Sequence, residues 1–575
     1  MANRTVGESI VEMLVNAGVA RVYGIAGDSL NAITDAIFDR QDITWVPMRH
    51  EEAGAFAAGA EAHLTGRLCV CAGSCGPGHL HLINGLYDCH RSRVPVLAIA
   101  AHVPSAEIGS AYFQETHPER LFVECSHFCE TVTRPQQLPR LLEIAMQTAI
   151  AKSGVSVLII PGDVALQRAS AAAPRVTIAY GASAVRPSDD RIAEAARLLN
   201  QAAKVTILAG AGCRDAHASL LAIADRLAAP VVHSMRGKEF VEHHNPFDVG
   251  MTGLLGFSSG YLAMKACDTL LMLGTDFPYQ QFYPEKAATV QVDIRGEQLG
   301  RRTRLDLGIV GDVRTTLEAL VPLLTIKQDR RHLEAALAHY AEARGSLDQL
   351  ATDRHDTGAV HPQYLAAMLD AHAPDDAIFT CDVGTPTVWA ARYLKMNGRR
   401  RLLGSFVHGS MANALPQAIG AQLAHPARKV IALSGDGGLA MLMGDLLTLN
   451  QIGAPVKVAV FNNASLGFVQ LEMRAAGLLD RGVALTNPDF ARIAEASGML
   501  GISVPTAADV APAIQRALAH DGPALLDVRV RTQELVMPPS LQLEQVGGFA
   551  LYLARAVLSG RGDEVIDLAK TNLRA

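Results

Sequence analysis

The sequence has few aromatic residues and only a small excess of charge. Phe, Trp and Tyr make up 5% of its 575 residues, and the formal net charge at pH 7 is −6. No basic domain or stripe stands out, which speaks against a role in nucleic-acid binding. The short basic run from Arg399 to Arg401 is interpreted as a solvated turn rather than a binding patch.

Long apolar runs are missing as well. Residues 1–18 lack the continuous apolar stretch of a signal peptide. No window reaches the roughly 20 apolar residues that a membrane-spanning helix needs. We therefore expect the protein to stay in the cytoplasm.

Cysteine is present but not in a metal-binding or disulfide pattern. None of the nine cysteines forms a C-x-x-C pair with matching His ligands, and an odd number does not suit a disulfide framework. Free, reduced thiols are the expectation for such a protein.

What the sequence does contain is a long alternation of short apolar runs and helical patterns. A chain of 575 residues is too long for one core and predicts three to four domains. Strands separated by helices indicate parallel βαβ units, so we predict an α/β fold with three doubly wound parallel-sheet domains and a C-terminal amphipathic tail. The predicted domains are residues 1–182, 183–336 and 337–533, and the tail is 534–575. The strands are predicted at 19–25, 43–48, 69–72, 94–100, 155–160, 205–208, 231–233, 269–273, 290–294, 308–310, 377–380, 430–434, 456–461 and 524–528.

The first and third blocks look distantly alike. Phe56-Ala-Ala-Gly-Ala-Glu-Ala-His-Leu resembles Pro416-Gln-Ala-Ile-Gly-Ala-Gln-Leu. Two related lobes would suit a cofactor held between them.

The sharpest motif is Gly435-Asp436-Gly437-Gly438, followed by Asn463 at 27 positions after Asp436. Both polar residues follow predicted strands, so they are expected at the carboxyl edge of a parallel sheet, where such sheets bind ligands. The glycines let the backbone approach a phosphate, and the oxygens of Asp436 and Asn463 suit Mg²⁺. Gly-Asp-Gly alone would be read as a tight turn, but the combination resembles the thiamine-diphosphate signature.

A thiamine site also needs a carboxylate from the partner lobe. Glu51, in Arg49-His50-Glu51-Glu52, follows a strand and opens a helix. It could hold a proton at N1′ of the pyrimidine ring from a buried position. The alternative is that Glu51 and Glu52 only complement the positive end of the helix.

Longer segments resemble the pyruvate oxidase branch of the thiamine-diphosphate enzymes, and within it the quinone-dependent pyruvate dehydrogenases of Gram-negative bacteria. These enzymes are peripheral membrane flavoproteins and homotetramers. The resemblance runs from the first strand to Asn572. It is carried by Arg49-His-Glu-Glu, Cys71-Ala-Gly-Ser-Cys-Gly-Pro-Gly, Tyr112-Phe-Gln-Glu-Thr-His-Pro, Gly274-Thr-Asp-Phe-Pro, Cys381-Asp-Val-Gly-Thr-Pro-Thr-Val-Trp and Gly409-Ser-Met-Ala-Asn-Ala-Leu-Pro.

The resemblance implies a role for each part of the thiamine site. Glu51 activates the pyrimidine, the Gly409 carbonyl receives the 4′-amino group, and Met411 is the wedge beneath thiamine. Asp436, Asn463 and the Ser465 carbonyl hold Mg²⁺. The other residues implied to contact the cofactor are Ser410, Gly437, Gly438, Ala464, Leu466, Gly467, Phe468 and Val469. Those implied to surround pyruvate are Phe113, Gln114, Val383 and Phe468.

The middle block is implied to bind FAD. No complete G-x-G-x-x-G follows a strand there, because Gly210-Ala-Gly-Cys breaks the pattern, and this weighs against an NAD-dependent enzyme. Asp293 ends a predicted strand, where it could accept a ribose hydroxyl proton. The implied flavin contacts are Thr252, Gly253, Leu254, Leu255, Thr275, Asp276, Phe277, Pro278, Tyr279, Asp293 and Asp312.

The implied function is oxidative decarboxylation of pyruvate to acetate and CO₂, with electrons passing through FAD to ubiquinone. The implied site is between the first block of one subunit and the third of its neighbour, in a homotetramer. The apolar tail around residues 549–558 would bind the phospholipid surface at the inner face of the bacterial cell membrane, although it lacks a Trp anchor. Two alternatives are an acetolactate-synthase-like carboligase with a non-redox FAD and a pyruvate oxidase that uses phosphate and O₂. A catalytically inactive scaffold would be expected to lose Glu51, Asp436 or Asn463.

Overall fold

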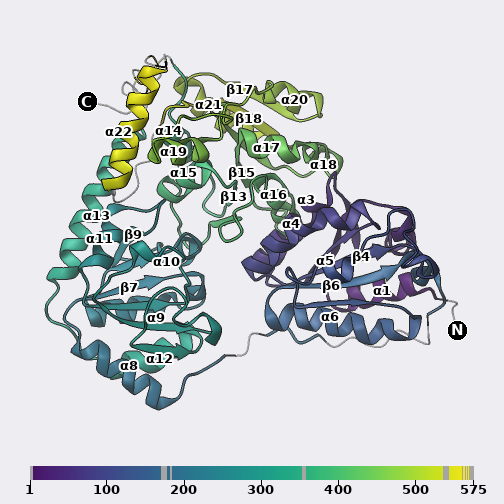
Figure 1. The fold of residues 1–575 in the computed structure, drawn as a ribbon, viewed down its shortest axis with the longest axis horizontal. Coiled ribbons are helices and arrows are strands. Elements are labelled where there is room, and N and C mark those ends of the chain that lie inside the picture. Colours follow the sequence, from purple (N-terminus) through teal and green to yellow (C-terminus); the bar gives the residue numbers. More distant parts are fainter. Residues whose placement is uncertain are drawn as a thin grey trace.

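The computed structural model contains three α/β domains, each built on a six-stranded parallel sheet (Figure 1). It describes residues 4–169, 178–181, 184–352, 358–534 and 543–559, together with residues 561, 563, 565 and 568. The predicted fold class is therefore confirmed for the three domains. The boundary between the predicted first and second domains, at residues 182 and 183, lies outside the described residues, as does much of the predicted tail.

The first domain has the strand order β2-β1-β3-β4-β6-β5. Alternate faces of its buried strands form two apolar layers, one beneath α1, α2 and α6 and one beneath α3 and α4. The strands are β1 (Arg21–Gly24), β2 (Thr44–Pro47), β3 (Cys69–Gly73), β4 (Val96–His102), β5 (Phe128–Thr131) and β6 (Val155–Pro161). The helices are α1 (Val6–Asn16), α2 (Asn31–Phe38), α3 (Glu51–Thr65), α4 (Pro77–Ser92), α5 (Pro118–Leu121), α6 (Leu138–Lys152) and α7 (Gly162–Leu166).

The third domain repeats this topology. Its order, β14-β13-β15-β16-β18-β17, is the same as that of the first domain when the strands of each sheet are numbered from one. The likeness of the first and third blocks therefore extends to the whole sheet. The strands are β13 (Ile378–Cys381), β14 (Arg401–Gly404), β15 (Val430–Gly435), β16 (Lys457–Asn462), β17 (Leu500–Val504) and β18 (Ala524–Arg529). The helices are α14 (Pro362–His372), α15 (Thr385–Tyr393), α16 (Ala414–Ala424), α17 (Asp436–Leu442), α18 (Leu446–Gln451), α19 (Gly467–Ala475), α20 (Phe490–Ala496) and α21 (Ala507–Ala519).

The middle domain has a different sheet, with the order β12-β11-β10-β7-β8-β9. Read from β9, this is the 3-2-1-4-5-6 arrangement of dinucleotide-binding folds. A long helix, α13, then leads to the third domain. The strands are β7 (Val205–Ala209), β8 (Val231–His233), β9 (Asp248–Met251), β10 (Thr269–Leu273), β11 (Ala288–Asp293) and β12 (Leu307–Val310). The helices are α8 (Asp189–Gln201), α9 (His217–Leu227), α10 (Lys238–Val241), α11 (Ser258–Ala266), α12 (Val313–Leu320) and α13 (Arg331–Leu350).

The first and third domains pack directly against each other through α3, α4 and α16 (Figure 1). The helices approach closely because small residues face each other: a Cβ atom on Gly420 would lie only 2.0 Å from the carbonyl oxygen of Ala57. Phe56 and Leu415 belong to one continuous buried apolar cluster that crosses the interface. The carboxyl edges of the two sheets are thereby held close together.

Four strands were not predicted, and all four are edge strands: β5, β9, β14 and β17. An edge strand pairs on one side only and need not be a continuous apolar run. In β5, for example, none of the four residues is buried. Prediction from apolar runs therefore found every central strand and, of the edge strands, only β2 and β12.

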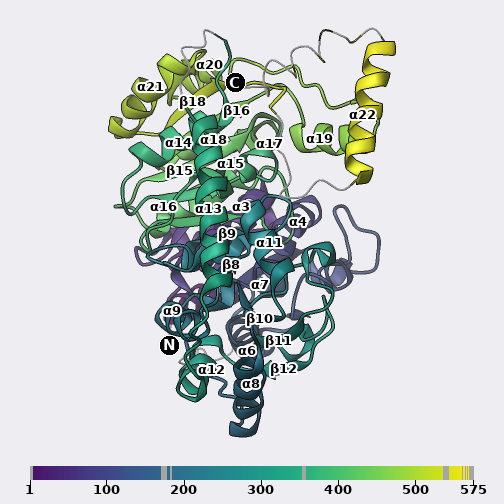
Figure 2. The same cartoon turned by 90° about the vertical axis from the view of Figure 1, so that its left-hand side faces the viewer.

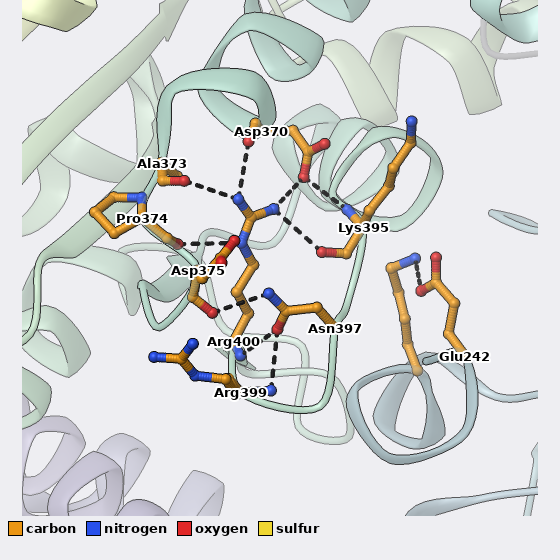
Figure 3. A network of polar contacts seen from close by, with 10 residues as sticks. Glu242, Asp370, Ala373, Pro374, Asp375, Lys395, Asn397, Arg399 and Arg400 are labelled. Atoms are coloured by element: carbon orange, nitrogen blue, oxygen red, sulfur yellow. Dashed lines mark hydrogen bonds and ion pairs between the residues drawn. The ribbon is translucent and has the colours of Figure 1, made fainter. Parts of the chain in front are cut away.

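The interpretation of the basic run at 399–401 as a solvated turn holds for Arg399, which is exposed in a bend, but is wrong for Arg400 and Arg401. Arg400 is buried and donates to the Asp370 carboxylate at 2.7 Å and to the Ala373 carbonyl at 2.8 Å (Figure 3). Arg401 opens β14, and its Nε lies 2.8 Å from a carboxylate oxygen of Glu239. The spacing of charges along the sequence does not reveal these long-range acceptors.

The C-terminal helix α22 (Leu543–Leu558) lies against α19 (Figure 2). A Cβ on Gly548 would be 2.0 Å from the carbonyl oxygen of Ala475, so this glycine permits the close contact. The Tyr552 side chain is buried, and Arg555 donates to the Gly477 carbonyl at 2.7 Å. Among the described residues, no helix is both long enough and apolar enough to cross a membrane.

Candidate active site

The predicted metal ligands lie at the ends of two neighbouring strands. β15 ends at Gly435, directly before Asp436, and β16 ends at Asn462, directly before Asn463. Asp436 is 3% exposed, and its two carboxylate oxygens accept the backbone N–H groups of Gly437 at 2.9 Å and Ala464 at 2.7 Å. Burial raises the pKa of Asp436 above its ordinary value.

The loop after β16 is shaped by its own side chains. Oδ1 of Asn463 accepts the N–H of Ser465 at 3.1 Å, and Ala464 between them has φ +54°. The hydroxyl oxygen of Ser465 is buried and has no hydrogen-bond partner among the described residues. The Asp436 carboxylate therefore contacts the loop that carries Asn463 and Ser465. Carboxylate, amide and carbonyl oxygens are the donors that a hard divalent cation prefers, and these residues offer all three.

Asn487 supports this cluster and was missed in the sequence. Its Nδ2 donates to Oδ2 of Asp436 at 2.7 Å and to Oδ1 of Asn462 at 2.9 Å. It lies in a loop beyond α19, with no motif around it, so no pattern in the sequence could have assigned it.

Asp382, at the end of β13, is a second residue that was missed. It is 1% exposed, and its oxygens accept the N–H groups of Ala414 at 2.9 Å and Gly435 at 3.2 Å. Burial raises the pKa of Asp382 to about 7. A Cβ on Gly438 would lie 2.4 Å from Oδ2 of Asp382, so this glycine is needed for packing as well as for access to a ligand.

Some of the residues predicted to contact thiamine from the third domain lie close to Asp436. A Cβ on Gly437 would lie 3.0 Å from the Leu466 side chain and 3.5 Å from Cε of Met411. Gly467 opens α19, and Phe468 follows it, half-buried against the core of the third domain. Gly409 has φ +83°, a conformation that glycine adopts without strain.

Glu51 is the first residue of α3 and is 5% exposed. The helix is capped by the neighbouring His50, whose Nδ1 accepts the N–H of Glu52 at 3.2 Å. One carboxylate oxygen of Glu51 lies 3.0 Å from Nδ1 of His81, and the His81 ring stacks on His50 with 4.5 Å between ring centroids. Glu51 is thus available for a role other than capping.

The residues on both sides of Glu51 reach the third domain. The N–H of Arg49 donates to Asp445 at 2.9 Å. On the other side, Nδ2 of Asn84 lies 2.7 Å from the Glu52 carboxylate and 2.8 Å from the Ser410 hydroxyl. Glu51 therefore stands beside residues that contact the third domain of the same chain. The expectation that the thiamine site forms between the first domain of one subunit and the third of its neighbour stays a prediction.

The four residues predicted to surround pyruvate are not all assembled. Phe113 is 79% exposed and so packs into no site formed by this chain alone. Gln114 has φ +66° and accepts a hydrogen bond from the Cys75 thiol at 3.4 Å, in the loop that leads to Gly78. A Cβ on Gly78 would lie 3.2 Å from the Glu51 carboxylate. Gln114 is thereby near Glu51, while Val383 and Phe468 are half-buried parts of the third domain.

The predicted flavin residues follow the strands of the middle sheet. Asp293 ends β11, is 3% exposed, and accepts the N–H of Arg295 at 2.9 Å; burial raises its pKa. Asp312 follows β12 and caps α12 by accepting the N–H of Thr315 at 3.0 Å. The Thr252 hydroxyl is buried and lacks a partner among the described residues. The remaining members, Gly253, Leu254, Leu255, Thr275, Asp276, Phe277, Pro278 and Tyr279, follow β9 or β10.

Three arginines that the sequence did not single out lie at this edge. Arg236 follows β8, Arg295 follows β11, and Arg93 comes from the end of α4 in the first domain. Arg236 donates to the Ser92 carbonyl at 2.8 Å. The pKa of Arg93 is lowered by burial and then by the charge of Arg295. Together they provide a cationic rim of the kind that suits a diphosphate.

The glycines of Gly210-Ala-Gly serve packing within the sheet. A Cβ on Gly210 would lie 2.5 Å from Cβ of Thr275, and one on Gly212 would lie 2.6 Å from Cα of Gly274. The loops after β7 and β10 are thus pressed together without a complete phosphate-binding fingerprint.

Models of three thiamine pyrophosphate (thiamine diphosphate) enzyme domains match the chain. The N-terminal binding domain matches residues 4–121, the central domain 192–320 and the C-terminal binding domain 382–528. The chain is 37% identical to the putative thiamine pyrophosphate-containing protein YdaP of Bacillus subtilis over 99% of both chains.

Two further relatives carry more specific names. Pyruvate oxidase of Lactiplantibacillus plantarum is 29% identical over 94% of this chain and 91% of its own length. Acetolactate synthase of Mycobacterium bovis is 30% identical over 93% of this chain and 89% of its own length. With matched domains in the same order as the three sheets, this chain belongs to the thiamine pyrophosphate-dependent enzymes.

Proposed function

We propose that the protein oxidatively decarboxylates pyruvate to acetate and CO₂ with thiamine diphosphate, Mg²⁺ and FAD, and passes the electrons to ubiquinone at the membrane. The observation that carries the proposal is the combination of a thiamine site with a dinucleotide-type middle sheet and a C-terminal helix packed on α19. Helix α19 itself begins with Gly467 and Phe468, two of the residues predicted to contact thiamine.

The residues of the first and third domains fit thiamine diphosphate. When bound, this cofactor supplies the nucleophilic carbon and the electron sink that allow a 2-oxo acid to lose CO₂. Glu51 would hold a proton at N1′ of the pyrimidine from its buried position, the Gly409 carbonyl would accept from the 4′-amino group, and Met411 would support the ring from below. The Met411 side chain lies next to Gly437, so the residue that would support the ring adjoins the residues that would line the diphosphate.

The oxygen cluster fits Mg²⁺ and a diphosphate. Asp436, Asn463 and the Ser465 carbonyl would hold the ion, because all three offer hard oxygen donors. Gly437, Gly438, Leu466 and Gly467 would line the diphosphate, since glycines let the backbone approach it closely. Ser410, Ala464 and Val469 would line the remainder, and Gln114, Phe113, Val383 and Phe468 would close around pyruvate.

The middle domain fits FAD, which supplies reversible two-electron storage when bound. The cationic rim of Arg93, Arg236 and Arg295 would receive the diphosphate. The unpartnered hydroxyl of Thr252 and the buried carboxylate of Asp293 offer polar contacts at the carboxyl edge, where such sheets bind dinucleotides.

The C-terminal helix supports a membrane-bound electron acceptor. It packs one face on α19 and leaves Val557 and Leu558 58% and 87% exposed. An apolar outer face of this kind suits the interface of a phospholipid surface. Peripheral attachment at the inner face of the cell membrane, and assembly into a homotetramer, belong to the same proposal.

The test is anaerobic reduction of the bound flavin. The purified protein is mixed with thiamine diphosphate, Mg²⁺ and pyruvate, and the absorbance of oxidised flavin is followed. Bleaching that recovers on addition of a soluble quinone, with acetate as product, is expected. An unbleached flavin with accumulating acetolactate would make the protein a carboligase, and recovery by O₂ with phosphate-dependent acetyl phosphate would make it a phosphate-dependent oxidase. Membrane binding by the tail is tested by sedimentation with phospholipid vesicles, and we expect the reduced protein to sediment with them.

A further inference from the structure

One face of α4 contacts the third-domain loop that carries Gly409 and Met411. Asn84, Tyr87 and Asp88 are spaced at i, i+3 and i+4, so their side chains emerge on the same side of the helix. All three contact the segment from Ser405 to Ser410. A helix of the first domain therefore faces the loop that offers the thiamine contacts.

Asp88 fixes the start of this loop through Ser405. One oxygen of the Asp88 carboxylate accepts the Ser405 hydroxyl at 2.7 Å. Because that hydroxyl has one proton, its lone pairs are left to accept, and they receive the N–H of Ser410 at 3.0 Å. The Ser405 carbonyl in turn accepts the N–H of Gly409 at 2.8 Å. The single residue Ser405 thus closes the loop on itself, and Asp88 orients Ser405.

The carboxylate of Asp88 is buried and is held by neutral hydrogen-bond donors. It is 4% exposed, its second oxygen accepts from Gln417 at 3.4 Å, and it forms no salt bridge within the described residues. Burial raises its pKa to about 6, opposed by the Ser405 hydrogen bond and the charge of Arg236. Burying a carboxylate costs free energy unless hydrogen bonds compensate for the lost water. The hydrogen bond from Ser405 therefore both stabilises Asp88 and fixes the loop.

Asn84 and Tyr87 hold the other end of the loop. Nδ2 of Asn84 donates to the Ser410 hydroxyl at 2.8 Å, and its Oδ1 lies 2.8 Å from Nε2 of His408. The Tyr87 ring stacks on His408 with 5.6 Å between centroids and an interplanar angle of 10°. Gly409 is therefore held from both of its neighbours, and the Ser410 hydroxyl also lies 3.0 Å from the Met411 carbonyl.

We propose that Asn84 and Asp88 are positioning residues for the thiamine site: they impose the shape of the loop from Ser405 to Met411 and so direct the Gly409 carbonyl and the Met411 side chain. This inference rests on the proposed use of thiamine diphosphate. In this arrangement the third domain takes its cofactor-binding shape from the first, so docking of the two domains and binding of the cofactor reinforce each other.

The experiment measures cofactor geometry as well as activity. The full-length variants Asp88→Ala, Asp88→Asn, Ser405→Ala and Asn84→Ala are titrated with thiamine diphosphate at saturating Mg²⁺. The readouts are Kd from calorimetry, the near-ultraviolet circular dichroism of the bound cofactor, and kcat and KM for pyruvate. Asn200→Ala is the control, because Asn200 hydrogen-bonds residues 323–325 of the middle domain, away from this loop.

Asp88→Ala and Ser405→Ala are expected to weaken cofactor binding by about tenfold or more, since each removes a buried hydrogen bond that shapes the loop. The dichroism of the bound cofactor should change, and kcat should fall more than KM for pyruvate rises. Asp88→Asn should keep most of the wild-type affinity for thiamine diphosphate, because its amide oxygen can still accept a hydrogen bond from the Ser405 hydroxyl. If Asp88→Ala does not fold, Ser405→Ala carries the same test.

Two outcomes separate the inference from the function on which it rests. Folded variants with wild-type affinity, dichroism and kcat would overturn the positioning role while leaving the proposed function intact. A wild-type protein that does not bind thiamine diphosphate would remove the proposed function itself.

Discussion

The guanidinium of Arg474 lies 2.8 Å from the carboxylate of Asp480, and both side chains are almost completely buried. The same carboxylate accepts from Gln470 at 2.7 Å and pairs with Arg561 at 2.6 Å. Arg474 also lies over the Tyr552 ring, 5.1 Å from its centroid. Helix α19, which begins in the active site, and the C-terminal segment are therefore tied to one buried charge.

Asp480→Asn is expected to loosen the C-terminal segment, because it leaves two arginines beside a neutral amide. Loss of one partner of a buried pair costs about 3 kcal/mol. We expect a lower thermal stability and faster proteolysis between residues 534 and 559. The exposed pair of Asp329 and Arg331 provides the control: Asp329→Asn should leave both measurements unchanged. A tail that is cleaved at the wild-type rate in Asp480→Asn would contradict the expectation.

Asn487→Ala should weaken Mg²⁺ binding. Its amide holds Oδ2 of Asp436, and removal of a residue that orients a metal ligand typically lowers affinity by about 10- to 100-fold. The apoprotein with thiamine diphosphate is titrated with Mg²⁺, and binding is followed by calorimetry. Equal Mg²⁺ affinity in Asn487→Ala and wild type would show that Asp436 needs no such support.

Glu51→Gln should abolish most of the catalytic rate while keeping the fold. The amide is the same size as the carboxylate but cannot hold the proton at N1′, so we expect pyruvate-dependent flavin bleaching to slow by about 10²-fold or more. Thiamine diphosphate should still bind. Glu52→Gln, at the next position of the same helix, is the matched variant and should lose far less. Comparable losses in the two variants would assign the effect to the helix terminus rather than to Glu51.

The free energy of unfolding should fall in mild acid because of His63. This histidine lies where the first, middle and third domains meet. Nε2 of His63 lies 3.4 Å from Glu239, which also binds Arg401 of β14. Burial lowers the pKa of His63 to about 4. The unfolded chain takes up this proton near its ordinary value of 6.5 and the folded chain only near 4, so unfolding is favoured progressively between pH 6.5 and 4.

Replacement of His63 tests this dependence. In His63→Gln the melting temperature should fall less steeply than in wild type over that pH range, since the group that titrates has been removed. The measurement is Tm against pH for both proteins at constant ionic strength. Parallel curves would mean that other groups carry the acid sensitivity.

The sequence predicted what is local and missed what depends on distant contacts. Asp436 and Asn463 were identified because they end adjacent strands in one strand–helix–strand unit, which a linear pattern records. Asp382 and Asn487 were missed because they act through hydrogen bonds to residues about 25 to 55 positions away. The packing of α16 against α3 within one chain was likewise not predicted, because no pattern of spacing records which distant helices meet.

The shared strand order of the first and third domains gives each strand of one sheet a counterpart in the other. Where Asp436 follows β15 in the third domain, Ser74 follows the corresponding strand β3 in the first. A serine hydroxyl carries no negative charge, so the corresponding strand end of the first domain lacks the anionic ligand that a divalent cation prefers. Two sheets of one topology therefore differ in which of them can bind a metal ion.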